Sequence, residues 1–347
     1  MNPSSRNPAA DEALSLVLDA FGLAPPGDVQ AAGGTATAKW VVTSAAGRFV
    51  LRVRPAEVAD EASIRFDHEV LRRLAAAGLP FPAPLARNDG STWLRLGDRV
   101  YEVLPWVSGE PFDYGDVEAV YGLGAFLARF HQALSQGVPP GKEGRIREDH
   151  PSLLEPYVSG LCRLTSNSRE RGQLERISEQ LDHVRGHLDS GLYASLPHCV
   201  IHGDIHPGNV GFQHSRVSAV YDFDYVSLQA RVRDISDGLI LFASARDSPL
   251  APDDIRSLTQ PFVPEEECCR LLLEGYRQAV ELTESEWRAL PLVMRSRWIQ
   301  MRLRGSRKVP EAEKVGFVLD RFFEVIDWLD RAAPGFFGRL RAALERG

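Results

Sequence analysis

The sequence predicts a two-lobed α+β fold, with a β-rich first lobe that carries one long helix and a larger, mainly α-helical second lobe. Strand-like segments and a single long amphipathic helix dominate roughly the first hundred residues. A segment at 105–111 that contains Pro and Gly then breaks the pattern, as a linker would, and helical periodicity prevails after it. We therefore expect lobes at residues 1–104 and 112–347, joined by a linker at 105–111.

The first lobe is expected to contain two helices and two pairs of strands. Leu14 to Phe21 has the pattern of a short amphipathic helix, which ends near Gly22. The other expected elements are strands at 39–43, 48–53, 92–96 and 100–104 and the longer helix at 61–77. Gly78 follows the longer helix and is a typical C-terminal stop.

The second lobe is expected to be helical except around a central segment. Residues 116–134 repeat apolar side chains every three to four positions, as a helix with one buried stripe does. Short strands are expected at 199–201 and 218–221, on either side of a turn. Thr283 and Glu286 have the spacing of a capping box, so a C-terminal helix is expected to begin there.

The most informative stretch is His202-Gly203-Asp204-Ile205-His206-Pro207-Gly208-Asn209, followed by Asp222-Phe223-Asp224. Asp204, Asn209 and Asp222 have the order and spacing of a phosphoryl-transfer site. An Asp can accept a hydrogen bond from an attacking hydroxyl, while an Asn oxygen and a second carboxylate are hard ligands suited to Mg²⁺. Either motif alone would carry little weight. The joint pattern is much rarer, and it predicts a nucleotide-dependent phosphotransferase.

These motifs resemble those of the aminoglycoside phosphotransferase and choline kinase-like superfamily, over roughly residues 33–237. The resemblance implies a bilobal protein-kinase-like fold, ATP and Mg²⁺ as cofactors, and phosphorylation of a small-molecule hydroxyl. It also implies that Asp204 is the catalytic base and that Asn209 and Asp222 bind metal. His206 stands where protein kinases carry a Lys that contacts the γ-phosphate, so it is expected to donate a hydrogen bond there or to hold the loop in place.

Phosphate-binding residues are expected in the first lobe. Gly33, Gly34 and Thr35 precede a hairpin, where glycines would let backbone N–H groups approach phosphate oxygens. The family pattern pairs a basic residue on the third strand with a Glu on the following helix, and Arg52 and Glu69 match these places. The family residue is usually Lys, and the planar fork of an Arg does not have the geometry of an ammonium group.

The adenine is expected to lie on the same face of the sheet. Val50 is two residues before Arg52, so the two side chains should point the same way. Residues 102–104, from Glu102 to Leu104, would form the hinge that presents backbone donors and acceptors to the base. Arg54 also lies on this face and competes with Arg52 as the phosphate-binding residue.

Acceptor contacts are expected from the second lobe. Asp224 and Asp237 lie near the catalytic segment in sequence and suit an amine-bearing acceptor. By the resemblance, Tyr276 and Trp298 lie on helices where the family builds acceptor pockets, although aromatic residues on helices are more often core. A basic run at 295–308 is most simply a solvated face, but it could instead hold an anionic group such as a carboxylate.

The spacing of the motifs disfavours a switched protein kinase. Only eleven residues separate Asp222 from Asp234, which leaves no room for a long activation segment. Gly203 also replaces the Arg that many protein kinases use to bind a phosphorylated activation loop. The sequence therefore favours a kinase of an amine-bearing small molecule, such as an aminoglycoside-type antibiotic. Open alternatives are a homoserine kinase-like or other metabolite kinase, a compact bacterial protein kinase, and an inactive nucleotide-binding module.

Composition limits the remaining classes. The 347 residues are 44% hydrophobic and 25% charged, as in ordinary globular proteins, and no apolar run is long enough to span a bilayer. The net charge of −7 disfavours non-specific nucleic-acid binding. The four cysteines lack metal-binding spacing and are expected to be reduced. We expect a cytoplasmic monomer or homodimer that binds a nucleotide and a small-molecule acceptor, but neither nucleic acid nor membrane.

Overall fold

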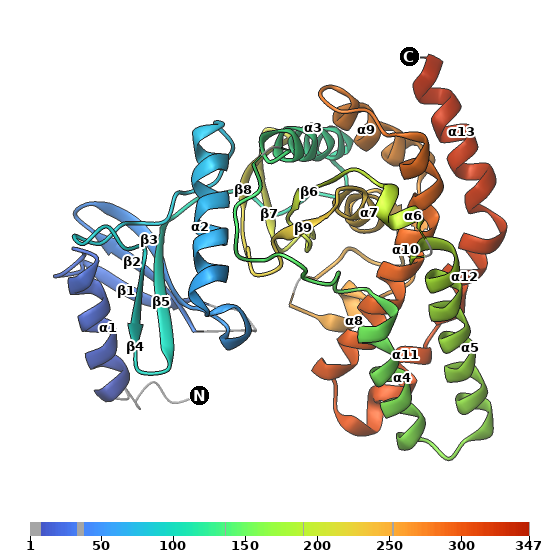
Figure 1. Cartoon of the computed structure of the whole chain (residues 1–347), viewed down its shortest axis with the longest axis horizontal. Coiled ribbons are helices and arrows are strands. Elements are labelled where there is room, and N and C mark those ends of the chain that lie inside the picture. Colours follow the sequence, from blue (N-terminus) through green and yellow to red (C-terminus); the bar gives the residue numbers. More distant parts are fainter. Residues whose placement is uncertain (1–7, 33–37, 136, 190, 252, 347) are drawn as a thin grey trace. The chain divides into compact units, whose positions relative to one another are not determined.

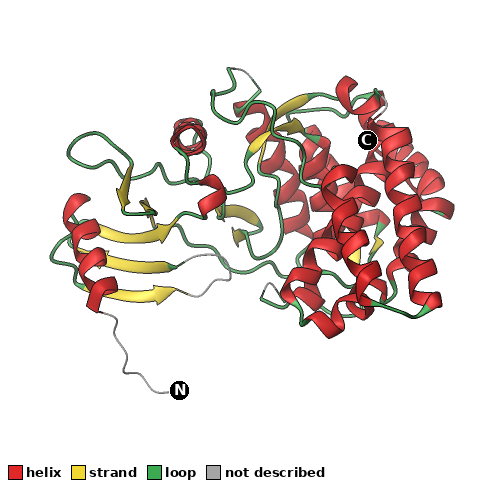
Figure 2. Cartoon of the chain, turned by 60° about the horizontal axis from the view of Figure 1, so that its bottom comes forward, coloured by secondary structure: helices red, strands yellow, loops and turns green. Residues whose placement is uncertain are grey.

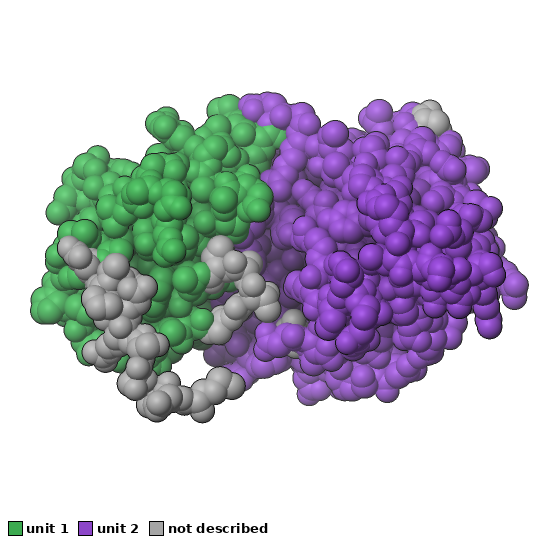
Figure 3. Space-filling view, turned by 90° about the horizontal axis from the view of Figure 1, so that it is seen from below, with its two compact units in different colours: residues 1–108, 139–142 green, residues 109–138, 143–347 purple. Residues whose placement is uncertain are grey.

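The computed structural model of the chain describes residues 8–32, 38–135, 137–189, 191–251 and 253–346. The chain divides into two compact units (Figure 3). Unit 1 comprises residues 1–108 and 139–142, and unit 2 comprises residues 109–138 and 143–347. Gly33, Gly34 and Thr35 lie outside the described residues, so the predicted phosphate-binding turn stays a prediction.

In the described residues, unit 1 contains one five-stranded antiparallel sheet, two α-helices and the short 3₁₀ helix η1 (Ala56–Val58) (Figures 1 and 2). The strand order is β1-β2-β3-β5-β4. The elements are α1 (Pro8–Ala20), β1 (Asp28–Ala32), β2 (Lys39–Ser44), β3 (Gly47–Val53), α2 (Glu61–Ala76), β4 (Trp93–Leu96) and β5 (Arg99–Pro105). The hairpin, the long helix and the last strand pair all lie close to where the sequence predicts them.

The two faces of the sheet in unit 1 have different roles. Phe49 and Leu51 of β3 are buried in a core cluster that also contains residues of α1. Because side chains alternate along a strand, Val50 and Arg52 point to the opposite face. On β5, Leu104 is in register with Val50 and Glu102 with Arg52, so all four side chains share that face.

In the described residues, unit 2 is mainly helical, with three two-stranded antiparallel pairs (Figures 1 and 2). The strand pairs are β6 (His198–Ile201) with β9 (Ser227–Ala230), β7 (Val210–Gln213) with β8 (Arg216–Val220), and β10 (Ser244–Ala245) with β11 (Val263–Pro264). The helices are α3 (Val117–Ala133), α4 (Pro151–Leu164), α5 (Ser168–Val184), α6 (Leu192–Ser195), α7 (Val232–Leu241), α8 (Ile255–Leu258), α9 (Glu266–Arg277), α10 (Glu284–Gly305), α11 (Lys314–Leu319), α12 (Phe322–Arg331) and α13 (Ala333–Arg346). Among the described residues, no helix is long and apolar enough to cross a membrane.

Local signals explain how the helices of unit 2 begin and pack. The predicted capping box is confirmed: the Thr283 hydroxyl accepts from the Glu286 N–H, and the Glu286 carboxylate accepts from the Thr283 N–H at 2.8 Å. Glycines allow α3 and α9 to approach closely, because a Cβ at Gly124 would collide with the carbonyl of Leu272. Together the two units confirm the predicted α+β organisation.

Candidate active site

The two sequence motifs meet in unit 2. The segment 202–209 connects β6 to β7. Asp222 lies two residues after the end of β8. The Tyr221 N–H donates to the Asn209 carbonyl at 2.9 Å, and the Asn209 side-chain amide donates to the Asp204 carbonyl at 3.0 Å. Pairing of β7 with β8 therefore brings the second motif beside the first.

Asp204 is held by a residue that the sequence analysis did not place in the active site. Its Oδ1 accepts a hydrogen bond from Nη2 of Arg297 on α10 at 3.1 Å, while 27% of its side chain stays exposed. Burial by itself raises the pKa of Asp204, but His206 and Arg297 outweigh that effect and hold it below its usual value. The carboxylate is therefore ionised and accessible at neutral pH.

Asp237 neutralises Arg297 and does not face an acceptor. Its side chain is fully buried, and its Oδ1 accepts from Nε of Arg297 at 2.5 Å. Arg233 approaches the other oxygen of Asp237 at 3.7 Å. The prediction that Asp237 binds the acceptor is wrong, because both of its carboxylate oxygens face buried guanidinium groups. Its contribution is to balance the charge that holds Asp204.

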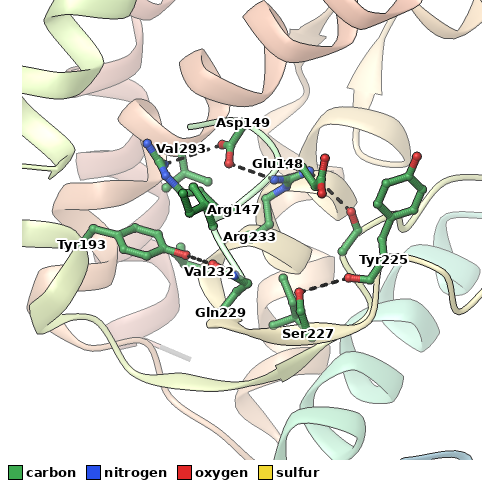
Figure 4. Close-up of a pocket in the computed structure, with 13 residues that line it drawn as sticks. Arg147, Glu148, Asp149, Tyr193, Tyr225, Ser227, Gln229, Val232, Arg233 and Val293 are labelled. Atoms are coloured by element: carbon green, nitrogen blue, oxygen red, sulfur yellow. Dashed lines mark hydrogen bonds and ion pairs between the residues drawn. The ribbon is translucent and has the colours of Figure 1, made fainter. Parts of the chain in front are cut away.

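A second buried acid, Asp149, belongs to the same network of buried charged side chains. Asp149 lies 3.1 Å from Nη1 of Arg233 and 3.8 Å from Nη1 of Arg147. Figure 4 shows these side chains converging around a cavity of about 20 Å³. Burial raises the pKa of Asp149, but Arg147 and Arg233 more than offset this and lower it. Because a Gln300 oxygen accepts from both Arg233 and Arg297, the network reaches from this cavity to Asp204.

His206 is poised as a neutral side chain. Its Nδ1 accepts from the Gly208 N–H at 3.0 Å, so the proton of the neutral ring is on Nε2. That nitrogen lies 3.6 Å from Oδ2 of Asp204. Burial lowers the pKa of His206 more than the nearby carboxylate of Asp204 raises it, so the net shift is downward. His206 thus holds the loop through one nitrogen and directs an N–H toward the carboxylate of Asp204 with the other.

His202 and Asp234 hold the backbone of the loop. The carboxylate of Asp234 accepts from the N–H groups of His202 and Gly203, both at 2.8 Å. His202 is completely buried, and its Nε2 donates to the Tyr221 carbonyl at 2.9 Å. His202 is therefore a structural histidine that links the two motifs.

Gly203 is required by the conformation of this loop. Its φ of +79° lies in the left-handed region, and a Cβ there would approach the carbonyl oxygen of Tyr225 to 2.9 Å. Asp222 also has a positive φ, of 61°. A non-glycine residue in this region is strained, and such strain is concentrated at functional sites.

Tyr276 and Trp298 belong to the core. Tyr276 is 1% exposed and its hydroxyl lies 2.9 Å from Nδ1 of His131, whose Nε2 lies 3.2 Å from Asp234. Trp298 has no exposed surface, and its indole N–H donates to the Phe322 carbonyl at 3.0 Å. Both predictions of acceptor contact are wrong, because these side chains point into the interior.

A cavity of about 170 Å³ opens on Asp204 and His206. Much of its wall is made by four apolar side chains, two polar side chains and Tyr225. Basic side chains make another part. These residues are Leu241, Ile255, Leu258, Met301, Thr259, Gln300, Tyr225, Arg297, Arg304, Arg307 and Lys308. Asp224 is not among the lining residues, so the structure does not bring it into this cavity. Among the described residues, Asp204 alone contributes a carboxylate to the lining.

Asn209 and Asp222 suit a divalent cation. The Asn209 amide nitrogen is used by the Asp204 carbonyl, so the side-chain oxygen is oriented away from that contact and can act as a hard ligand. No group of three or more His, Cys, Asp or Glu residues that could hold a metal occurs in the described part of the chain. One amide oxygen and one carboxylate match the needs of Mg²⁺, which usually keeps several waters and binds through one or two protein groups plus phosphates.

In unit 1, the predicted Arg52–Glu69 ion pair is absent. Glu69 is on the solvent side of α2, where it pairs with Arg72 and with Arg73. Arg52 instead contacts the carboxylate of Glu102 on the neighbouring strand. The prediction for Glu69 is wrong because its place on the helix points it away from the sheet.

Arg54 and α2 complete this buried cluster. Arg54 donates to Glu102 at 2.9 Å and to Asp67 at 2.5 Å, and Lys142 also contacts Asp67 at 2.5 Å. Nε2 of His68 lies 2.7 Å from Glu102. Burial raises the pKa of Glu102, but the two arginines hold it well below its usual range. The acid of α2 that takes part in this cluster is therefore Asp67, which pairs with Arg54 directly after β3.

The predicted hinge at Glu102 and Leu104 conflicts with the main-chain pairing of β5. The Arg54 N–H donates to the Val100 carbonyl, and the Leu85 N–H donates to the Val103 carbonyl. Because main-chain groups alternate along an antiparallel strand, those of Glu102 and Leu104 point at β3 and are part of the sheet. Neither residue can present its main chain to a base, so the hinge prediction for them is wrong.

Comparison with known proteins places this geometry in a family. The model of the phosphotransferase enzyme family, APH, matches residues 28–272. A homoserine kinase of Granulibacter bethesdensis is 26% identical over 284 residues, which cover 82% of this chain and 82% of that protein.

Two solved structures are similar in fold. Amicoumacin kinase hAmiN, in complex with AMP-PNP, Ca²⁺ and Ami, has a TM-score of 0.68 and 18% identity, with 93% of each chain covered. An aminoglycoside phosphotransferase of Alicyclobacillus acidocaldarius has a TM-score of 0.63 and 18% identity, with 100% of this chain and 98% of that chain covered. The predicted kinase-like fold is thereby confirmed. Since the family model spans well over half of its length, the chain belongs to the phosphotransferase enzyme family.

Proposed function

We propose that this protein is an ATP- and Mg²⁺-dependent kinase that transfers a phosphoryl group to the hydroxyl of a small molecule bound beside Asp204. The observation that carries the proposal is the cavity that opens on an ionised, accessible Asp204. The names of the relatives support a small-molecule acceptor, since they include a homoserine kinase and an amicoumacin kinase.

In this proposal Asp204 orients the acceptor hydroxyl and takes its proton as the oxygen attacks. Because His206 and Arg297 lower its pKa, Asp204 is a weak base, which suits a reaction in which positioning and charge stabilisation matter more than early proton removal. Asn209 and Asp222 would hold Mg²⁺, which when bound neutralises charge on the phosphates. Arg297 keeps the carboxylate in one orientation.

Nucleotide contacts in unit 1 are proposed for the sheet face that carries Val50, Arg52, Glu102 and Leu104. Val50 and Leu104 would provide an apolar surface for the base. The guanidinium of Arg52, oriented by Glu102, would supply positive charge for the phosphates. Glu102 on β5 would then orient the phosphate-binding side chain, as a Glu on the helix does in the family pattern.

The proposal concerning the acceptor changes with the structure. An amine-bearing acceptor was suggested by Asp224 and Asp237, but Asp237 is buried against Arg297 and Asp224 does not line the cavity. A metabolite kinase of the homoserine kinase-like kind is the second candidate. It is supported by the basic side chains in the lining of the cavity and by the homoserine kinases among the relatives.

The test is ADP release over a panel of amino alcohols, hydroxy-amino acids and aminoglycosides, with Asp204→Asn as the decisive variant. That variant should lose roughly 10²–10⁴ in kcat, the usual contribution of a positioned base, while Mg-ATP binding measured by calorimetry stays nearly unchanged. Asp98→Asn, an exposed residue between β4 and β5, is the matched control and should behave as wild type. Wild-type turnover in Asp204→Asn would refute the mechanism.

A further inference from the structure

We propose that the acceptor carries an anionic group, a carboxylate or a phosphate, and that Arg307 and Lys308 bind it in the cavity that opens on Asp204. This inference rests on the proposed kinase function and specifies the acceptor class. The basic side chains near the cavity differ in whether acidic or carbonyl groups of the protein already pair with them.

Two arginines of α10 lie in the interior and serve the fold. Arg302 is buried and donates to the carbonyls of Thr259 at 2.6 Å and of Asp320 at 2.7 Å. Arg295 is buried on the same helix and contacts Gln180 and Asp330. The prediction of a solvated basic face is therefore wrong for this helix, and neither guanidinium is available to an acceptor.

Arg297 and Arg304 line the cavity, but each already faces an acidic side chain. Arg297 is neutralised by Asp237 and bonded to Asp204. Arg304 forms an ion pair with Glu148. Their positive charges are offset within the protein, so they shape the wall of the cavity and add little net field to it.

Arg307 and Lys308 differ from these four. They belong to the short 3₁₀ helix η3 (Ser306–Lys308), their side chains are exposed, and both line the cavity. Neither forms an ion pair with a carboxylate of the described residues. Two positive charges without a carboxylate partner among the described residues thus lie in the wall of a cavity to which, in the described part of the chain, Asp204 alone contributes a carboxylate.

This distribution of charge favours one class of acceptor. A cavity lined by one sign of charge attracts ligands of the opposite sign and repels those of the same sign. Arg and Lys both bind carboxylates and phosphates, Arg through a fork and Lys as a point charge. The apolar residues of the lining, Leu241 and Met301 among them, suit a short hydrocarbon spacer. A hydroxyl at Asp204 and an anion at Arg307 and Lys308 can then belong to one small molecule, whereas a polycation is repelled.

The experiment compares acceptors that differ by one charged group. L-Homoserine carries an amine and a carboxylate. 4-Hydroxybutanoate carries the carboxylate alone, and 3-aminopropan-1-ol carries the amine alone. Glycerol 3-phosphate carries a phosphate. Steady-state ADP release gives kcat and KM for each. Calorimetric titration of Asp204→Asn in the presence of Mg-ATP gives binding without turnover. The carboxylate and phosphate arms show which anion the cavity takes.

The double variant Arg307→Gln with Lys308→Gln should raise KM and Kd for the preferred anionic acceptor about tenfold or more, equivalent to about 1.4 kcal/mol or more. The values for 3-aminopropan-1-ol should stay the same or improve. Salt should weaken wild-type binding of the anion, since the two side chains are exposed. The matched control is Arg288→Gln with Arg331→Gln, which removes two exposed positive charges outside the cavity lining and should change nothing.

The outcomes separate the two proposals. If 3-aminopropan-1-ol is the better acceptor, or the double variant affects all acceptors equally, the anion site is refuted while the kinase function stands. If no anionic acceptor binds in the calorimeter, the anion site is likewise refuted. If an anion binds through Arg307 and Lys308 but wild type releases no more ADP than Asp204→Asn, the kinase function fails and the anion site stands.

Discussion

Arg297 shows what a sequence can and cannot predict about a single residue. The motif residues Asp204, Asn209 and Asp222 lie within nineteen positions of one another and can be found by spacing alone. Arg297 reaches Asp204 from a helix 93 residues further along the chain. A helical Arg is usually exposed, so no local signal could place it at the active site. The long-range fold decides its role.

At the residue scale, Arg297→Gln should lower kcat and shift the acid limb of the kcat–pH profile to higher pH. The reason is that Arg297 lowers the pKa of Asp204 and keeps it ionised, so its removal lets protons compete at higher pH. The variant leaves Asp237 buried without its closest partner, which should cost about 3–5 kcal/mol of stability. The measurement is kcat from about pH 4 to 8, together with urea unfolding.

Two variants separate positioning from folding. Adding Asp237→Asn to Arg297→Gln removes the uncompensated acid, so stability should recover while the shifted acid limb remains. Arg295→Gln, at another buried arginine of α10, should lose stability without any shift of the limb. An unshifted limb in both Arg297 variants would limit Arg297 to a structural role.

At the element scale, local patterns were sufficient where a helix or strand is defined by its own residues. The hairpin, α2, α3 and the capping box of α10 carry such signals and were predicted near their observed bounds. The error at Glu69 came from giving a motif priority over helical geometry. Asp67 lies three residues after Ile64 and four before Leu71, so it shares their buried face. That spacing was available in the sequence.

The helices α3, α7 and α9 are connected by a buried chain of hydrogen bonds, which yields a second prediction. Tyr276→Phe should destabilise the protein by about 1–3 kcal/mol, because His131 loses its partner in the interior. KM for both substrates should stay unchanged, since Tyr276 does not line the cavity at Asp204. Tyr157→Phe, at a half-buried tyrosine of α4, is the control and should cost less. A raised acceptor KM in Tyr276→Phe would restore the acceptor role that the burial of its side chain contradicts.

At the scale of the whole molecule, buried arginines neutralise several carboxylates of the interior. Only four lysines occur among forty basic residues. Arginines are buried in both units, and Arg54, Arg233 and Arg297 each contact at least two carboxylates. A planar fork suits such bridging better than an ammonium group does. Composition could not reveal this, because a count of charges does not show which of them are inside.

The same balance predicts how stability depends on pH. The pKa values of Glu102, Asp149 and Asp234 are lowered on folding from ordinary values of 4.5, 3.8 and 3.8. Their stabilisation is fully present above those values and is lost as the pH falls through the lower folded values. The pKa of His206 is lowered from 6.5, so the unfolded chain binds its proton first and stability starts to fall below that pH.

Urea unfolding from about pH 8 down to about pH 3 should therefore show two stages of destabilisation. The first begins below 6.5, the ordinary pKa of His206, and the second below 4.5, the ordinary pKa of Glu102. His206→Asn should reduce the first stage and leave the second intact. It should not abolish the first stage, because burial also lowers the pKa of His183. A free energy of unfolding that rises between pH 6.5 and 5 would contradict the assignment of His206.

The membership of residues 139–142 in unit 1 has a consequence for how the protein can be divided. The chain leaves unit 1 after Ser108, returns for four residues and leaves again after Lys142. Among the described residues, Asp67 has two cationic partners, Lys142 and Arg54. A fragment that ends at Ser108 would lack Lys142 and keep only half of that neutralisation. A single proteolytic cut that keeps Lys142 must also keep residues 109–138 of unit 2, so unit 1 cannot be released on its own with its ion pairs intact.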